Sequence, residues 1–346
     1  MKTSPVPGAR PSAHAPGQML SALRALPSPA IRPPARQLCA SAGTWYDGSM
    51  PAPRRDMSDN IAKLRGMIRD CTLCARGCRV DRTAGKLGAC RAGPQAVVAS
   101  AGPHFGEEPP LVGSGGSGAI FLAGCNLDCV FCQNFDISHP PDVGRAGTEM
   151  PPDRIAGLAI SLEARGCENI NFVSPTHVAH AVGEAIAVAR SRGLVVPIVY
   201  NCGGYESVET LRLLEGLIEI YMPDFKWASA AAGRKYSGVA DYPGVATAAL
   251  AEMFRQVGPL KPDGRGVAER GVLVRHLVMP GDLARSRDVI DIVAKTAPAC
   301  AINVMGQYHP MFRASEFPEL LARPSESEIN EFRKYAAEKG LIRADH

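Results

Sequence analysis

The sequence predicts an α/β fold, a partial (β/α)6 barrel, and two regularities support this prediction. From Gly118 onward, short apolar runs alternate with amphipathic stretches of helical spacing. The stretches are about ten or more residues long, which is the length that a crossover between parallel strands requires. Six such units, fewer than the eight of a closed barrel, predict a sheet that is open at one side.

The amino-terminal residues differ from the rest in charge. The chain has 38 basic and 34 acidic side chains; residues 1–56 contain seven and two of these, which leaves 31 basic against 32 acidic in residues 57–346. This larger part has no basic excess of the kind that binds nucleic acid. No run approaches the ~18 apolar residues of a membrane-spanning helix, so we expect a soluble protein that does not bind membranes.

Residues 1–56 are rich in Pro, Ala and Arg and lack periodicity. Such a segment buries too little apolar surface to offset its conformational entropy, so we expect a disordered extension. Its Arg and Ser content also fits an organelle transit peptide, and translation from Met57 would leave the segment out. Cys39 lies in this segment, and we assign no role to it.

Residues 57–117 are predicted to be a four-cysteine metal-binding segment followed by a connector. Cys71, Cys74, Cys78 and Cys90 have C-x2-C-x3-C-x11-C spacing on a short stretch that contains glycines. Four thiols so close together fit a closed zinc site or an auxiliary iron-sulfur cluster, and the spacing does not decide between the two. Free or disulfide-forming thiols are the alternative.

The connector has the sequence "GPHFGEEPPLVGSGGSG". Its adjacent carboxylates, Glu107 and Glu108, offer an acid/base pair. We expect instead that they are exposed to solvent, as charged residues in a Pro/Gly-rich connector usually are. The stretch "GSGGSG" satisfies the pattern G-x-G-x-x-G but precedes a strand instead of linking a strand to a helix. We therefore predict a flexible turn and no dinucleotide site.

Residues 118–312 are predicted to form the barrel, and residues 313–346 a C-terminal helical extension. The runs predicted to be strands are 119–124, 169–174, 195–201, 216–225, 271–280 and 300–305. The stretches predicted to be helices are 153–165, 177–192, 206–215, 242–257 and 282–297. In the extension, a capping box between Ser325 and Glu328 predicts a last helix over 326–339.

In a barrel of parallel strands, the reacting groups gather where the strands end. Each predicted strand is followed by residues suited to a site. In chain order these are Cys125, Cys129 and Cys132; Ser174, Pro175, Thr176 and His177; Asn201, Cys202, Gly203 and Gly204; Asp224 and Lys226; Arg275 and His276; and Gln307, Tyr308 and His309. We expect all six sets to face one mouth of the barrel.

The stretch "GCNLDCVFCQN" places Cys125, Cys129 and Cys132 in C-x3-C-x2-C spacing on one loop. A structural zinc site takes four protein ligands, and no fourth ligand is near in sequence. A 4Fe-4S cluster held by three thiolates leaves one iron open to a substrate or cofactor. The motif therefore predicts an iron-sulfur cluster with a free coordination position.

This motif, with Phe131 before its last cysteine, resembles the signature of the radical S-adenosylmethionine (SAM) superfamily. The resemblance implies a partial radical SAM barrel in which the open iron binds the amine and carboxylate of SAM. It also implies that one electron, from a donor such as flavodoxin or ferredoxin, cleaves SAM to methionine and a 5′-deoxyadenosyl radical. That radical then abstracts a hydrogen atom from a substrate.

Residues 71–310 are most similar to pyruvate formate-lyase activating enzymes, in particular to an uncharacterised branch related to them. The resemblance puts Asp224 of "YMPDFK" near a monovalent cation, and Lys226 within reach of the SAM carboxylate. The residues that match cofactor-facing positions are Phe131, Asn201, Cys202, Asp224, Lys226, Arg275 and His309.

One position departs from this family. Activating enzymes carry Gly-Gly-Glu after the second strand to bind the SAM amine, and this chain has "SPTH" there. Thr176 and His177 are the candidates to replace it. The departure leaves open whether the substrate is a glycyl radical enzyme.

The eleven cysteines of the chain are mostly clustered, which favours a reducing compartment, and we expect the cytoplasm. Cys167 and Cys300 are expected to be core thiols. Three functions remain open: activation of a glycyl radical enzyme, modification of a peptide or small molecule, and a non-catalytic iron-sulfur or zinc scaffold. The polar sets at six strand ends favour an enzyme, because a scaffold would not need them.

Overall fold

The protein is described by a computed structural model, which covers residues 57–344. The extension predicted over residues 1–56, with Cys39, lies outside the described residues, so its disorder remains a prediction. The described residues belong to one compact unit.

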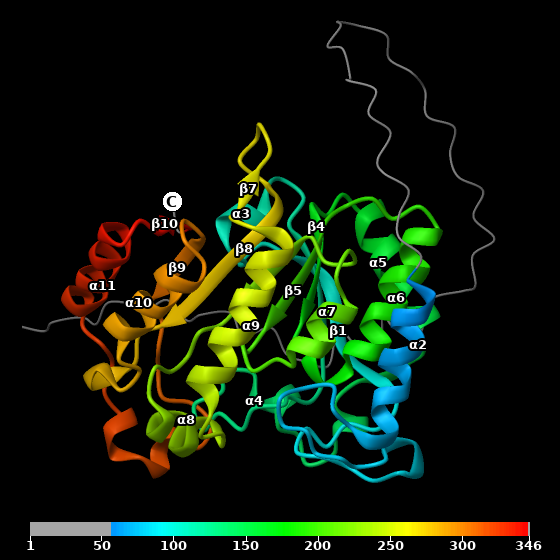
Figure 1. The fold of residues 1–346 in the computed structure, drawn as a ribbon, viewed down its shortest axis with the longest axis horizontal. Coiled ribbons are helices and arrows are strands. Elements are labelled where there is room, and N and C mark those ends of the chain that lie inside the picture. Colours follow the sequence, from blue (N-terminus) through cyan, green and yellow to red (C-terminus); the bar gives the residue numbers. More distant parts are fainter. Residues whose placement is uncertain (1–56, 345–346) are drawn as a thin grey trace, which may run out of the picture. The chain divides into compact units, whose positions relative to one another are not determined.

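The centre of the fold is a sheet with six neighbouring parallel strands, which confirms the predicted partial barrel (Figure 1). In spatial order from one side they are β9 (Ala301–Met305), β8 (Ala268–Leu277), β6 (Ile220–Pro223), β5 (Ile198–Cys202), β4 (Asn169–Val173) and β2 (Ser117–Leu122). The interior of the sheet is apolar: Val199, Ile220 and Leu273 are fully buried in one core cluster. Because these strands are covered on both faces, their sequences are short runs of apolar residues.

The predicted helices are present and lie along the outside of the sheet (Figure 1). They are α5 (Pro152–Ala164), α6 (Ala179–Ser191), α7 (Val208–Leu213), α9 (Tyr242–Val257), α10 (Ser286–Thr296) and α11 (Glu326–Glu338). The predicted capping box starts α11: the Ser325 hydroxyl accepts from the Glu328 amide, and the Glu328 carboxylate accepts from the Ser325 amide at 2.8 Å.

Further elements were not predicted. The additional α-helices are α2 (Ser58–Gly66), α3 (Pro109–Val112), α4 (Phe135–Ser138) and α8 (Ala230–Ser237). Short 3-10 helices span Met67–Asp70, Arg82–Ala84, Val143–Arg145, Thr176–Val178, Pro280–Asp282, Ala314–Glu316 and Pro318–Leu320.

The sheet also extends beyond the six parallel strands. Strand β1 (Ala96–His104) pairs antiparallel with β2 and with β3 (Thr148–Met150), and β7 (Lys261–Pro262) pairs antiparallel with β8. Strand β10 (Ile342–Arg343) adds a parallel edge beside β9. The last three residues of β1, Gly102, Pro103 and His104, lie in the predicted connector, because Gly and Pro are uncommon inside strands.

The segment between β1 and β2, residues 105–116, closes the amino-terminal end of the barrel, and we call it the plug. In Figure 1 its helix α3 lies at the opposite end of the sheet from α4, which follows the three-cysteine loop. Leu111 of the plug is fully buried in the core cluster that contains Val199 and Ile220. Glu107 and Glu108 of the plug are also largely buried. The side chain of Glu107 is 10% exposed, and Glu108 is 6% exposed. Their expected exposure to solvent was wrong.

Among the helices that the structure describes, none has the length and apolar character needed to cross a membrane.

Candidate active site

A cavity of about 260 Å³ lies at the carboxyl ends of the six parallel strands. Every strand end contributes to its wall, as the sequence predicted. The contributing residues include Cys125, Cys129 and Cys132 after β2; Ser174 after β4; Asn201, Cys202 and Gly203 at the end of β5; Asp224 and Lys226 after β6; Arg275 and Leu277 in β8; and Met305 and Gln307 at β9. The cavity is therefore the candidate active site.

The three cysteines lie on the loop that leaves β2 at Gly124, whose φ of +87° turns the chain at this point. Each thiol has a polar neighbour: Cys129 Sγ lies 3.1 Å from Ser237 Oγ, and Cys132 Sγ lies 3.1 Å from Ser138 Oγ. The Leu127 amide donates to Cys125 Sγ at 3.4 Å. Hydrogen-bond donors of this kind stabilise sulfur that carries negative charge, as cluster ligands do.

The number of thiols fits a cluster better than a structural zinc ion. A structural zinc site takes four protein ligands. Three thiols around an open cavity, with no fourth protein ligand among them, match a cluster with one exposed iron. Burial raises the pKa of the Cys129 thiol to about 11, although Lys226 opposes this shift. Ligation would displace these protons.

Aromatic side chains pack behind the cysteine loop. Phe131, which precedes the last cysteine, is 6% exposed and meets Trp227 edge to face with ring centroids 5.6 Å apart. Its ring also lies 6.2 Å from that of Tyr308. Trp227 donates to Ser237 Oγ at 2.8 Å, so this packing also positions the hydroxyl beside Cys129.

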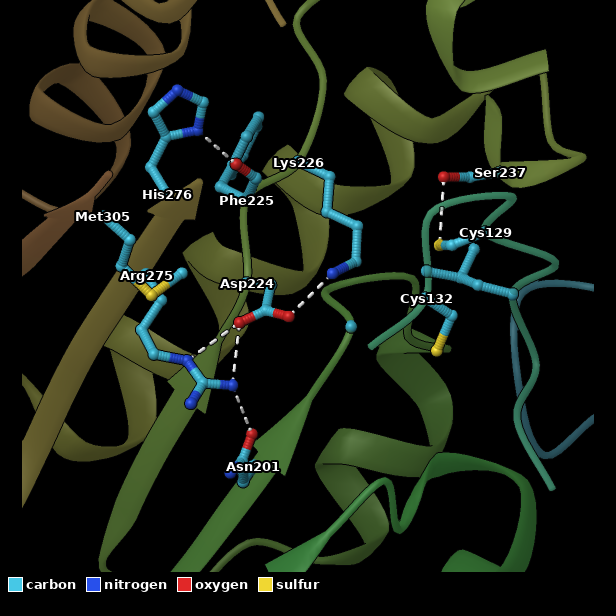
Figure 2. A network of polar contacts seen from close by, with 12 residues as sticks. Cys129, Cys132, Asn201, Asp224, Phe225, Lys226, Ser237, Arg275, His276 and Met305 are labelled. Atoms are coloured by element: carbon cyan, nitrogen blue, oxygen red, sulfur yellow. Dashed lines mark hydrogen bonds and ion pairs between the residues drawn. The ribbon is translucent and has the colours of Figure 1, made fainter. Parts of the chain in front are cut away.

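A network of charges forms the wall opposite the cysteine loop (Figure 2). Asp224 lies between two cations: Arg275 Nε donates to its Oδ1 at 2.9 Å, and Lys226 Nζ donates to its Oδ2 at 2.7 Å. Arg275 Nη2 also donates to Asn201 Oδ1 at 2.7 Å. The predicted residues Asn201, Asp224, Lys226 and Arg275 therefore meet in one hydrogen-bonded group.

The charges in this group stabilise one another. Burial alone would raise the pKa of Asp224, but Arg275 and Lys226 hold it below its ordinary value. Burial likewise works against charged Lys226, yet the pairing with Asp224 raises the pKa of this amine. The group is therefore ionised at neutral pH.

Two carboxylates that were expected to be exposed lie beside this network. Glu107 of the plug lies beneath the cavity floor, where its Oε1 is 3.4 Å from Arg275 Nη1 and its Oε2 accepts from Asn171 Nδ2 at 2.8 Å. Glu108 accepts from Asn303 Nδ2 at 2.8 Å. No local sequence signal identifies these carboxylates, because the pairing of β1 with β2 brings them into the barrel.

Seven of the residues predicted to face the mouth do not line the cavity: Pro175, Thr176, His177, Gly204, His276, Tyr308 and His309. Thr176 donates to Glu206 at 2.8 Å, and His177 Nε2 contacts the Ala123 carbonyl at 2.7 Å, so neither lines the cavity. His309 also lies outside its wall and contacts the Gln307 carbonyl at 3.1 Å. His276 points away from the charge network, toward the Phe225 carbonyl 2.7 Å away (Figure 2).

The turn after β4 explains the positions of Thr176 and His177. Ser174 adopts a left-handed φ of +59°, and the chain enters a 3-10 helix at Thr176. The side chain that reaches the cavity is therefore Ser174. Cys202 does line the cavity, as predicted, and is 2% exposed.

Comparison with known proteins identifies the central part of this fold. Residues 119–223 match the model of the radical SAM superfamily. An uncharacterized protein of Methanocaldococcus jannaschii is 28% identical over 293 residues, which are 83% of this chain and 79% of that protein. A second uncharacterized protein of the same organism is 29% identical over 96 residues, which are 28% of each chain.

Among solved structures, the chain is similar to HydG, described as a maturase of the FeFe-hydrogenase. The TM-score is 0.41 and the sequence identity 11%, and the match covers 66% of this chain and 55% of that one.

Replacing Asp224 tests the charge network. We expect Asp224→Asn to lower the free energy of unfolding by about 3 kcal/mol, because it leaves two largely buried cations, Lys226 and Arg275, with Glu107 as their one nearby anion. This loss of stability is at the low end for removal of one partner of a buried ion pair, because the side chain of Asp224 is still 21% exposed. Urea denaturation measures it. As a control, Asp153→Asn breaks an exposed pair with Arg192 and should cost about 1 kcal/mol or less; equal losses would contradict the network.

Proposed function

Because the chain belongs to the radical SAM superfamily, we propose that it is an enzyme that reductively cleaves SAM at a 4Fe-4S cluster held by Cys125, Cys129 and Cys132. The observation that carries the proposal is that these three thiols and the Asp224 charge network line one cavity. When bound, the cluster supplies one electron that breaks a C–S bond of SAM, giving methionine and a radical that abstracts hydrogen from the substrate.

The polar side chains of the cavity have distinct roles in this proposal. Lys226 Nζ has one carboxylate partner, Asp224, and can donate a further hydrogen bond to the carboxylate of SAM. Arg275 binds Asp224, Asn201 and Glu107 and so positions those groups, but these contacts use at most four of its five N–H donors. Arg275 therefore stays a proposed SAM contact. Ser174 takes the place of the absent Gly-Gly-Glu as the polar group after β4. A monovalent cation beside Asp224 stays a prediction from the family resemblance.

Product analysis tests this function. After anaerobic reconstitution with iron and sulfide and reduction with dithionite, the protein should convert SAM to methionine and 5′-deoxyadenosine in equal amounts. Cys129→Ser removes a cluster ligand and should abolish both products. Cys167→Ser, a buried thiol remote from the cavity wall, should leave them close to the wild-type level. An intact cluster that yields neither product would refute the proposal and favour the non-catalytic scaffold.

The size of the cavity bears on the substrate. Its 260 Å³ is below the ~300–1,000 Å³ of pockets that enclose a drug-sized ligand, and cluster and SAM must share it. Little of this space would then remain for the substrate, so we propose that the reacting C–H bond is presented at the mouth by a chain segment of a protein. We propose activation of a glycyl radical enzyme, by abstraction of hydrogen from a backbone glycine, as the finer form of the function.

Isotope transfer tests this finer proposal. The glycyl radical enzymes of the source organism, produced with glycine deuterated at Cα, should each be incubated with the reduced protein and SAM. The true partner should transfer one deuterium atom to 5′-deoxyadenosine and acquire a glycyl radical signal in electron paramagnetic resonance. A partner whose reactive glycine is changed to alanine is the control. Unlabelled 5′-deoxyadenosine with every candidate would favour modification of a peptide or small molecule.

The electron donor has a candidate docking surface. A hollow of about 400 Å³ reaches Cys125 from outside and is lined by Arg76, Arg91 and Arg313. Arg313 pairs with Asp128 at 3.0 Å, whereas Arg91 forms no ion pair within residues 57–344. The surplus positive charge beside a cluster ligand suits an acidic donor such as flavodoxin or ferredoxin.

Charge reversal tests this surface. Arg91→Glu should slow the reduction of the cluster by flavodoxin roughly tenfold at low salt, and the difference should shrink as salt is added. Reduction by dithionite should not change, because it needs no docking. Arg165→Glu, at the exposed end of α5 far from the strand ends that line the cavity, is the matched control. Equal flavodoxin rates in the two variants would contradict docking at this hollow.

A further inference from the structure

The four cysteines of the amino-terminal segment converge on a second, separate cavity. Cys71, Cys74, Cys78 and Cys90 all line a space of about 10 Å³. The segment that carries them has little regular structure of its own, with a single 3-10 helix, Arg82–Ala84, between Cys71 and Cys90. A metal held by the four thiols would therefore add to the stability of the segment.

The backbone around Cys78 is shaped to accept a sulfur atom. A Cβ placed on Gly88 would lie 2.9 Å from Cys78 Sγ, which is too close. Any residue larger than glycine would therefore displace this sulfur. The next residue, Ala89, donates its amide to the same sulfur at 3.5 Å. An amide that points at sulfur stabilises a thiolate more than a neutral thiol.

A buried cation beside these cysteines lacks an anionic partner. Arg82 is 1% exposed; its guanidinium donates to the carbonyls of Gly93, at 3.0 Å, and His177, at 2.7 Å, and lies 4.0 Å from Cys71 Sγ. No carboxylate in residues 57–344 forms an ion pair with it. The carbonyl oxygens accept hydrogen bonds from Arg82 but carry no net negative charge to balance the guanidinium. A buried charge without a counter-charge is strongly unfavourable.

We propose that Cys71, Cys74, Cys78 and Cys90 bind one zinc ion, and that Arg82 neutralises part of the negative charge of the resulting site. Four thiols lose their protons to solvent as four sulfur–zinc bonds form, and no electron is transferred. The site then carries a net charge of about −2, which supplies the anion that Arg82 lacks. This inference does not depend on the proposed SAM chemistry.

The cavity among the four thiols is small in this structure. Its 10 Å³ is about what one water molecule occupies, which is room for a single ion. The thiols do not yet surround one point at ligand distance. Zinc binding therefore requires them to turn inward about their Cα–Cβ bonds.

The zinc segment would also support the three-cysteine loop. The Cys90 carbonyl lies 3.1 Å from the position that a Cβ on Gly124 would take, directly before Cys125. Arg76 Nε donates to the Asn126 carbonyl at 2.7 Å, and Asn126 forms part of the wall of the second cavity. Loss of the metal should therefore loosen the loop that holds the catalytic cysteines.

Metal analysis of the full chain tests this site. In a variant in which Cys125, Cys129 and Cys132 are all serine, elemental analysis should find one zinc ion per chain and no iron. Replacement of zinc by cobalt should give the intense thiolate-to-cobalt absorption of a four-sulfur site. Iron with sulfide bound to that variant, or no metal at all, would overturn the proposal.

Substitution of Arg82 tests the charge argument without removing a ligand. Arg82→Met should weaken zinc binding by about 10–100-fold in competition with a chelator, as loss of a partner outside the ligand shell typically does. Arg82→Lys should restore part of the affinity. Arg79→Met is the control, since Arg79 is in the same segment with its side chain 67% exposed. Equal zinc affinity in Arg82→Met and Arg79→Met would exclude the role of Arg82.

Discussion

The ion pair between Asp224 and Arg275 is the interaction on which the candidate site depends. The two residues form a parallel bridge between neighbouring strands, so the backbone holds their side chains together. Arg275 also binds Asn201 at the end of β5 and Glu107 of the plug. One guanidinium thus connects three strand ends and the plug, and a buried charge of this kind is stable only while its partners stay in place.

This dependence explains why the plug enters the barrel. Without Glu107 and Glu108, the floor of the cavity would hold two cations, Arg275 and Lys226, and a single carboxylate, Asp224. Glu107 balances the second cation. Burial raises the pKa of Glu108, so it retains a proton more readily than an exposed glutamate does.

Sequence reasoning predicted the parts of this protein that depend on local pattern. Helix α9 spans 242–257 as predicted, and the six strands were found because buried parallel strands are apolar runs. Which side chains enter the cavity depends on the geometry of each strand end. Ser174 enters and His177 does not, because a left-handed residue and a 3-10 turn redirect the chain. Glu107 was missed for another reason: its position follows from strand pairing over a distance, which no local pattern encodes.

The two sets of cysteines differ in the charge that faces them. Lys226, beside Cys129, is already paired with the carboxylate of Asp224. The positive charge of Lys226 therefore does not need a negative charge from the three-cysteine site. A centre that gains and loses an electron benefits from such an arrangement, because its own charge must change. Arg82, in contrast, has only carbonyl oxygens and a cysteine sulfur around it. That environment favours a centre with a net negative charge, such as the proposed four-thiolate zinc site.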